Sequence, residues 1–228
     1  MEPMWPVDAT PEYVEARVAL AKTERSLRQQ IDEIAAARRA MPPGSPLKDY
    51  RFAEGPVDLG LDEPVRDVSL RELFEGRSSL FVYHLMFHPD DEEPCSMCSM
   101  WVDGLHGVAH HLRRHTAFAV IAKAPLPKLR AWARRRGWDG LRIVSSHGTS
   151  FNADMNAERA DGAQRPMVSV LTEEDGQVRH FYTLPANFHD DAEGGIDVLS
   201  PVWNVLDLLP GGRGNWYAGN DYAGRLRG

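Results

Sequence analysis

The sequence predicts an α/β fold, in which a central mixed sheet is flanked by helices. Three apolar runs, at residues 80–87, 116–122 and 141–146, alternate with segments of helical periodicity. Right-handed crossovers connect such a series as parallel strands beneath covering helices. Two further strand-like runs flank Asp175 and Gly176, the strongest hairpin signal in the chain, and they predict an added antiparallel pair.

The first forty residues predict a long amphipathic helix. Thr10 and Pro11 suit the N-cap and the first helical position, and apolar residues then recur at roughly helical spacing up to Arg39. A segment rich in proline and glycine follows and ends the helix. We therefore expect a helical arm and linker at 1–48, a main domain at 49–210 and an aromatic, glycine-rich tail at 211–228. The apolar stripe of the arm needs a cover, which favours a homodimer.

Shorter helices are expected within and after this α/β series. Ser69 is a plausible cap for one or two turns, and "LPKLRAWARRRG" predicts a basic helix that Gly137 ends. Residues 194–212 suggest an amphipathic helix. The rhythm after the cysteines is also helical, although Gly104 and Gly107 weaken it.

The composition excludes some classes of partner. The chain has 33 acidic and 26 basic residues among 228, a formal charge of -7, so nucleic acid would be repelled. No run approaches the roughly 20 apolar residues of a membrane span, and the start has no secretory pattern. We therefore expect a cytoplasmic protein with no membrane and no nucleic acid partner.

Cys95 and Cys98 are the only cysteines, and they have C-x-x-C spacing. In a reducing compartment such a pair is redox-active or binds a metal. If Cys95 begins the helix after Pro94, unpaired backbone N–H groups and the helix dipole favour its thiolate. Cys98, one turn later, can then attack a mixed disulfide at Cys95. The acidic run from Asp90 to Glu93 opposes a thiolate, so the sequence leaves the direction of the pKa shift open.

The order of these elements resembles the thioredoxin fold. A buried strand, C-x-x-C at a helix start, a second parallel strand and a proline before a hairpin follow one another within residues 50–184. The resemblance implies that Pro166 is the cis-proline that lies opposite the cysteine pair and shapes the substrate-facing surface. The sequence departs from the thioredoxin pattern in two ways: Pro94 replaces a tryptophan, and the dipeptide Ser96–Met97 replaces Gly-Pro.

A closer resemblance extends over most of the chain. It is carried by "LRELFEGRSSLFVYHLMFHPD", "CSMCSMWVDGLHGVAHHL", "AKAPLPKLRAWARRRGW" and "SSHGTSFNADM". These segments resemble a bacterial thioredoxin-like family of unknown function, whose members are described as predicted dithiol-disulfide oxidoreductases. The resemblance implies a thiol or disulfide substrate, either a protein or a small molecule, and no organic cofactor. It names no substrate, because the description is itself an inference from the fold.

Three alternatives remain open. The first is a peroxiredoxin, because "FVYHLMFHPDDEEPCSMC" resembles the strand and following proline of those enzymes. Peroxiredoxins have a threonine three residues before the reactive cysteine, whereas this chain has Glu92 three residues before Cys95. A soft-metal site for copper or zinc is also conceivable. Cys95, Cys98, His106 and His110 would form it, or methionines beside the thiols would bind Cu(I), although the spacing does not match a zinc finger. The third is an interaction module with inert cysteines.

Two further residues are candidates for the substrate-facing surface. The strand that carries His84 leads toward the cysteines, so its imidazole is a candidate for proton exchange with a thiol. The other interpretation is a hydrogen-bonded core histidine. Trp101 either borders a substrate groove or packs against the sheet. The basic run at Arg134–Arg136 either binds an anionic substrate or is a solvated helix end.

Overall fold

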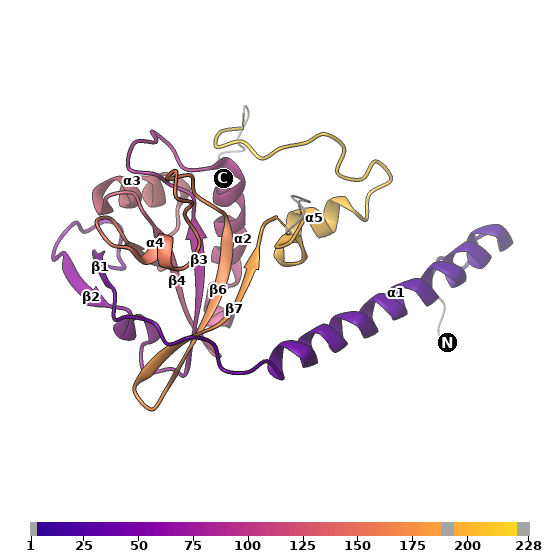
Figure 1. Ribbon diagram of the computed structural model, residues 1–228. Helices are drawn as coiled ribbons and strands as arrows, with labels where there is room; N and C mark the ends of the chain where they lie inside the picture. The colour runs from indigo at the N-terminus through magenta and orange to yellow at the C-terminus, as the bar shows by residue number, and fades with distance from the viewer. Residues whose placement is uncertain (1–3, 188–193, 223–228) are drawn as a thin grey trace. The chain divides into compact units, whose positions relative to one another are not determined.

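The computed structural model describes residues 4–187 and 194–222 (Figure 1). The chain divides into two compact units, Met1–Pro43 and Gly44–Gly228. No helix in the described ranges is long and apolar enough to cross a membrane.

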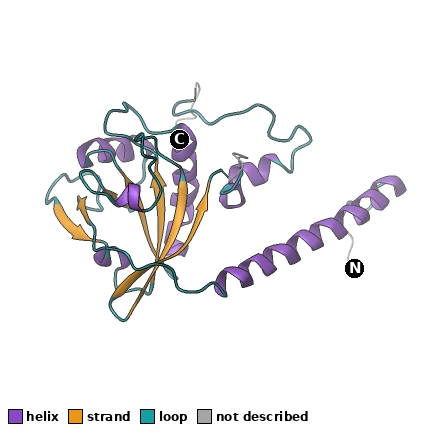
Figure 2. Ribbon diagram, viewed as in Figure 1, coloured by secondary structure: helices purple, strands orange, loops and turns teal. Residues whose placement is uncertain are grey.

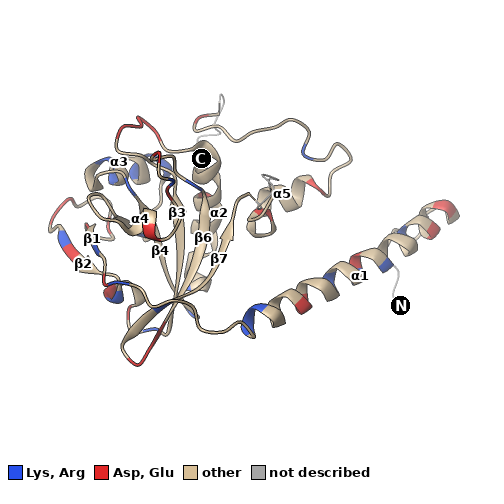
Figure 3. Cartoon of the chain, in the orientation of Figure 1, with Lys and Arg blue, Asp and Glu red and all other residues tan. Residues whose placement is uncertain are grey.

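The first unit contains the predicted long helix, α1 (Pro11–Arg39). The Thr10 hydroxyl accepts a hydrogen bond from the Tyr13 N–H at 3.3 Å, as expected of an N-cap. Acidic and basic residues are distributed along the whole helix (Figure 3). None of its residues is buried, and Leu27 of the apolar stripe is 57% exposed.

The second unit is built on one seven-stranded sheet, with strand order β2-β1-β5-β4-β3-β6-β7. Strands β3, β4 and β5 are parallel and the other pairs are antiparallel, so the predicted mixed sheet is confirmed. The two four-residue strands at one edge, β1 and β2, were not predicted. The strands are β1 (Arg51–Glu54), β2 (Arg66–Ser69), β3 (Ser79–Leu85), β4 (Ala117–Ala122), β5 (Arg142–Ser145), β6 (Met167–Glu174) and β7 (Gln177–Pro185).

Each face of the sheet has its own core, because successive side chains of a strand point to opposite faces. Tyr83 and Leu85 of β3 join one cluster with α2 (Ser96–Leu112), α3 (Leu126–Arg136) and α5 (Pro201–Leu206). Leu80 and Val82 join the other cluster, with η1 (Arg71–Phe74) and α4 (Phe151–Asp154). Helices therefore flank both sides of the strands (Figure 2). The cysteines lie on the α2 face.

Local signals explain most of the connections. Asp175 and Gly176 both have positive φ, 50° and 75°, as a two-residue turn between β6 and β7 requires. Ser69 and Glu72 form a reciprocal cap at η1: the Ser69 N–H donates to Glu72 Oε2 at 2.7 Å, and the Glu72 N–H donates to Ser69 Oγ at 3.2 Å.

The predicted helix after the cysteines forms, whereas the predicted helix at 194–212 forms only in part. Helix α2 continues through Gly104, where a Cβ atom would lie 3.3 Å from Pro201 Cδ, so the glycine allows α5 to approach closely. The predicted helix at 194–212 is wrong in extent. It consists of η2 (Asp197–Leu199) and the six-residue α5, because Ser200 is extended and Pro201 starts a new helix.

Candidate functional site

The two cysteines lie at the amino end of α2, directly after β3. Cys95 is the N-cap residue, and its N–H donates to the Met86 carbonyl at 3.0 Å. Its carbonyl accepts from the Ser99 N–H at 3.0 Å, which begins the helix. Both cysteines are free thiols; Cys95 is partly exposed and Cys98 is buried, with 1% exposure. The reactive end of the pair therefore faces solvent and its partner lies one turn deeper.

The environment of Cys95 lowers its thiol pKa to about 6. The largest cause is a hydrogen bond from the Cys98 thiol, and the N–H groups of Cys98 and Met97 and the Tyr217 hydroxyl add to it. Burial acts in the opposite direction. These donors stabilise the thiolate, as the position at a helix start predicts.

Two carboxylates of the acidic run before Cys95, those of Glu93 and Asp91, are engaged by groups other than the thiol. The Glu93 carboxylate accepts from Arg135 and from the Asn220 amide, at 2.5 and 2.9 Å, and the bond from Arg135 lowers the pKa of Glu93. Asp91 accepts from the His88 N–H at 2.9 Å. The direction that the sequence left open is therefore toward the thiolate.

Cys98 has the opposite character. The hydrogen bond to Cys95, burial and the Cys95 charge raise the pKa of Cys98 well above its ordinary value. The Tyr83 hydroxyl and the Met86 N–H act against this increase. Tyr83 is fully buried, its hydroxyl has no oxygen or nitrogen partner in the described ranges, and burial raises its pKa also. At neutral pH the pair is therefore a thiolate at Cys95 and a thiol at Cys98.

Cys95 borders a pocket of about 520 Å³. One side of this pocket is the segment before α2, including His88 and Glu93, and the other side is the loop at residues 161–164. A substrate sulfur can therefore approach Cys95 from solvent. The buried Cys98 cannot be reached in this way.

The C-terminal tail reaches this site, which the sequence did not indicate. The Asn220 amide also donates to the Pro94 carbonyl at 3.1 Å, and the Asn220 carbonyl accepts from Arg136 at 2.9 Å. Asp221 forms an ion pair with Arg135. Two arginines of the predicted basic run thus bind the tail, and the tail brings Tyr217 to Cys95.

Of the two interpretations of His84, the structure supports the hydrogen-bonded core histidine and not proton exchange with a thiol. Its ring stacks on Phe151, with centroids 5.7 Å apart, and Nε2 lies 2.9 Å from Ser169 Oγ. Phe151 belongs to the core on the face opposite the cysteines. Alternation along β3 sends Tyr83 to the cysteine face and the adjacent His84 away from it. Burial is the main cause that lowers the pKa of His84 to about 3, so His84 is a neutral core histidine.

Trp101 also lies in the core, because it faces the sheet one turn along α2 from the cysteines. It is 6% exposed and lines neither of the two described pockets.

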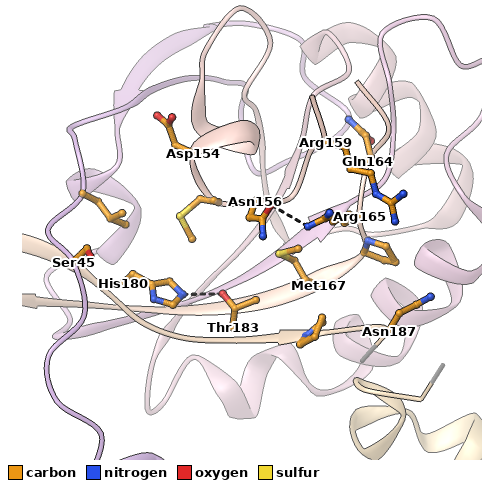
Figure 4. A pocket seen from close by; sticks show the side chains of 14 residues that line it. Ser45, Asp154, Asn156, Arg159, Gln164, Arg165, Met167, His180, Thr183 and Asn187 are labelled. Carbon is orange, nitrogen blue, oxygen red and sulfur yellow. Dashed lines mark hydrogen bonds between the residues drawn. The ribbon is translucent and has the colours of Figure 1, made fainter. Parts of the chain in front are cut away.

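Pro166 precedes β6 as expected, but the predicted cis bond is wrong: within the described ranges, the cis peptide bond is Glu63–Pro64. The trans form suits the extended backbone here, in which the Pro166 carbonyl accepts from the Ala186 N–H at 2.9 Å. Pro166 lines a second, larger pocket of about 1010 Å³ (Figure 4). It does not line the pocket that contains Cys95.

The predicted site of two cysteines and two histidines is not assembled. Cys98 and His106 are eight residues apart on one helix, a separation of roughly 12 Å along its axis at 1.5 Å per residue. His106 instead lies 2.9 Å from the Asp139 carbonyl. Among residues 4–187 and 194–222, no three His, Cys, Asp or Glu side chains are grouped to hold a metal ion.

The structure is similar to several solved structures, some of which are named peroxiredoxins. Enterococcus faecalis AhpC matches with a TM-score of 0.50 and 11% identity, over 69% of this chain and 87% of that chain. The reduced 2-Cys peroxiredoxin of Plasmodium vivax matches with a TM-score of 0.49 and 12% identity, over 72% and 96%. Peroxidoxin BcpB of Mycobacterium tuberculosis matches with a TM-score of 0.49 and 13% identity, over 73% of this chain and 98% of that chain. At these identities the likeness concerns the fold, which is thioredoxin-like.

No curated protein matches the sequence. A family model does match, and it covers residues 3–225, almost the whole chain. The chain therefore belongs to the family described as bacterial protein of unknown function, DUF899.

Proposed function

We propose that the protein is a thiol-disulfide oxidoreductase, with Cys95 as nucleophile and Cys98 as resolving thiol. One observation carries this proposal: the two thiols share a hydrogen bond but have opposite pKa shifts and opposite exposure. A thiolate accessible from a pocket, with a protected thiol one helical turn behind it, is the arrangement that dithiol exchange needs.

The reaction follows from these positions. The Cys95 thiolate attacks one sulfur of a substrate disulfide, forms a mixed disulfide and expels the other half as a thiolate. Cys98 then loses its proton and attacks the Cys95 sulfur. This step forms the Cys95–Cys98 disulfide and expels the remaining half, which takes up a proton. The substrate gains two electrons, and an external dithiol restores the enzyme.

The first step prepares the second. The hydrogen bond to Cys95 and the negative charge of Cys95 are major causes of the high Cys98 pKa, and both disappear once Cys95 carries a mixed disulfide. Burial continues to raise the pKa of Cys98, whereas the Tyr83 hydroxyl lowers it. Cys98 therefore becomes easier to ionise at the stage when it must attack.

We expect the Cys95 thiolate to titrate near pH 6. A pKa of about 6 leaves about nine-tenths of Cys95 ionised at pH 7, whereas an unperturbed thiol titrates near 8.5. Thiolate absorbance against pH measures this directly, with the Cys95→Ser variant showing no transition in that range. A midpoint at or above about 8.5 would contradict the proposed nucleophile.

Tyr83→Phe is expected to slow the resolving step and to leave the first step nearly unchanged. It removes a hydroxyl that favours the Cys98 thiolate, and hydrogen bonds to charged groups contribute about 1.5–3 kcal/mol, which corresponds to about tenfold or more. Stopped-flow measurement of thiol release separates the two steps. The matched control is Tyr13→Phe, on α1. Equal resolving rates in the two variants would exclude a role for Tyr83.

Peroxide reduction is a second candidate, because Cys95 is ionised and accessible on a fold shared with peroxiredoxins. The thiolate would attack hydrogen peroxide to give a sulfenic acid and hydroxide. Condensation with Cys98 would then give the same disulfide and water. Competition between hydrogen peroxide and dithiodiethanol, the disulfide of mercaptoethanol, for the reduced protein decides which substrate is preferred.

The broader proposals concern organisation and location. We propose a cytoplasmic protein with an arm and linker at 1–48, a catalytic domain at 49–210 and a tail at 211–228. The exposed apolar stripe of α1 supports a homodimer formed through the arm. Light scattering of the full chain and of Leu27→Glu tests the dimer, since a charge in the stripe would dissociate it.

A further inference from the structure

The pocket at Cys95 has a larger neighbour, which we call the arginine pocket. It has a volume of about 1010 Å³, and its charged lining includes Arg159, Arg165 and Asp154. Gln164 lines both pockets, so the loop that faces Cys95 on one side forms part of the arginine pocket on the other. The two pockets therefore adjoin each other at Gln164.

The two arginines have unused hydrogen-bond donors. Arg165 uses Nη1 to donate to Asn156 Oδ1 at 2.9 Å, and its other guanidinium nitrogens have no partner within the described residues. The Arg159 guanidinium has no ion pair or side-chain hydrogen bond there either, since that residue bonds only through its backbone. Figure 4 shows both side chains on the same side of the pocket. Guanidinium groups bind carboxylates through paired N–H donors.

The acidic residue of the pocket does not neutralise them. Asp154 accepts hydrogen bonds from Lys48, Tyr50 and Ser150, which lower its pKa to about 2. Its carboxylate lies apart from the arginines in Figure 4. The arginine side of the pocket therefore keeps its positive charge.

Gln164 supplies the second observation. Both its amide oxygen and its amide nitrogen are buried, and neither has a hydrogen-bond partner in the described residues. Buried polar atoms without partners are costly, and a ligand carboxylate that accepts a hydrogen bond from the Gln164 amide nitrogen would offset part of this cost.

The wall of the pocket opposite the arginines, which includes His180 and Thr183, is uncharged. His180 Nε2 lies 2.8 Å from Thr183 Oγ1, and Thr183 Oγ1 lies 2.9 Å from Ser169 Oγ, so these groups bond to one another. Burial lowers the pKa of His180 and keeps it neutral. Met155, Met167 and Pro185 add apolar surface to the lining, which also includes the uncharged polar residues Ser45 and Asn187. Such a pocket suits a short aliphatic stem that ends in an anion.

We propose that the arginine pocket binds the carboxylate end of a small disulfide substrate, between Arg159 and Arg165, and that Gln164 orients it toward Cys95. This inference rests on the proposed oxidoreductase function and names the substrate class. The exchange reaction is the one given above, with a carboxylate-bearing thiol as its product.

Three disulfides of matched chain length test the proposal: dithiodipropionate is anionic, dithiodiethanol is neutral and cystamine is cationic. In the unmodified protein, kcat/KM should be at least about tenfold higher for dithiodipropionate than for dithiodiethanol, and lowest for cystamine. The double variant Arg159→Gln/Arg165→Gln should lose this preference, because its kcat/KM should fall further for dithiodipropionate than for dithiodiethanol. The matched control is Arg114→Gln, just beyond the carboxyl end of α2, which should keep the preference.

A binding measurement separates this inference from the proposed function. Adipate has the carboxylates of dithiodipropionate but no sulfur, and calorimetry should show that it binds the unmodified protein and binds the double variant at least about tenfold more weakly. Absence of adipate binding, or equal kcat/KM for anionic and neutral disulfides, overturns the arginine pocket alone. Tight adipate binding without reduction of any of the three disulfides overturns the proposed function and leaves the binding site standing.

Discussion

Cys95→Ser is expected to abolish disulfide reduction, with a decrease in rate of at least about a thousandfold, as for the loss of a covalent nucleophile. Cys98→Ser is expected to remove turnover as well, but at the second step. Because Cys95 stays intact in that variant, it should still attack a disulfide and then remain as a mixed disulfide. Mass spectrometry after addition of dithiodiethanol should therefore show one added mercaptoethanol group on Cys98→Ser and none on Cys95→Ser.

The asymmetry between the two variants is the critical result, because it follows from the exposure of Cys95 and the burial of Cys98. Ser96→Ala, between the two cysteines, is the matched control and should turn over normally. Trapping on Cys95→Ser in place of Cys98→Ser would reverse the assigned roles. Trapping on neither would indicate inert cysteines, which the sequence allowed as an interaction module. A bound metal would instead block alkylation of both thiols in the unmodified protein.

Arg142→Met is expected to destabilise the second unit by about 3–5 kcal/mol, the cost of removing one partner of a buried ion pair. Arg142 and Glu54 join β5 to β1, and both side chains are less than one-tenth exposed. Arg142 Nε donates to Glu54 Oε1 at 2.5 Å, and Nη1 donates to the Glu72 carbonyl at 2.8 Å. Urea unfolding measures the change. Without Arg142, Glu54 keeps only the mostly exposed Arg66 as an ionic partner in the described residues.

Two controls identify the cause of that loss. Arg51→Met removes an exposed ion pair with Asp67 in the same region and should cost about 1 kcal/mol or less. The double variant Glu54→Leu/Arg142→Leu removes both buried charges, so it should be more stable than Arg142→Met. Equal stabilities for Arg142→Met and Arg51→Met would show that the buried pair contributes little. The pKa of Cys95 should be the same in all three folded variants, because none of the substituted residues is among the groups that shift it.

The local sequence predicted much of the fold, since strands, helices and tight turns depend on neighbouring residues. The apolar runs became β3, β4 and β5, and the turn at Asp175 and Gly176 formed with the positive φ angles that such turns require. The cysteine pair was equally local, because one helical turn fixes the distance from Cys95 to Cys98. The short strands β1 and β2 escaped prediction, since four residues give too little periodicity.

The surroundings of the cysteines depended on contacts between distant residues. His84 was placed at the site because it lies in the right strand. A strand alternates its side chains, however, and the packing of α2 decides which of Tyr83 and His84 faces the thiols.

By itself, the sequence determined the thioredoxin-like order of elements and the placement of Cys95 at a helix start, because both follow from patterns within a few residues. The main cause of the lowered Cys95 pKa is local, the hydrogen bond from Cys98 one turn along the helix, and only the tertiary structure added the burial that opposes the shift and the Tyr217 hydroxyl that supports it. Only packing, too, brought Gln164 between two pockets. Charges and donors act through space, so their effect on a thiol is fixed when the chain folds.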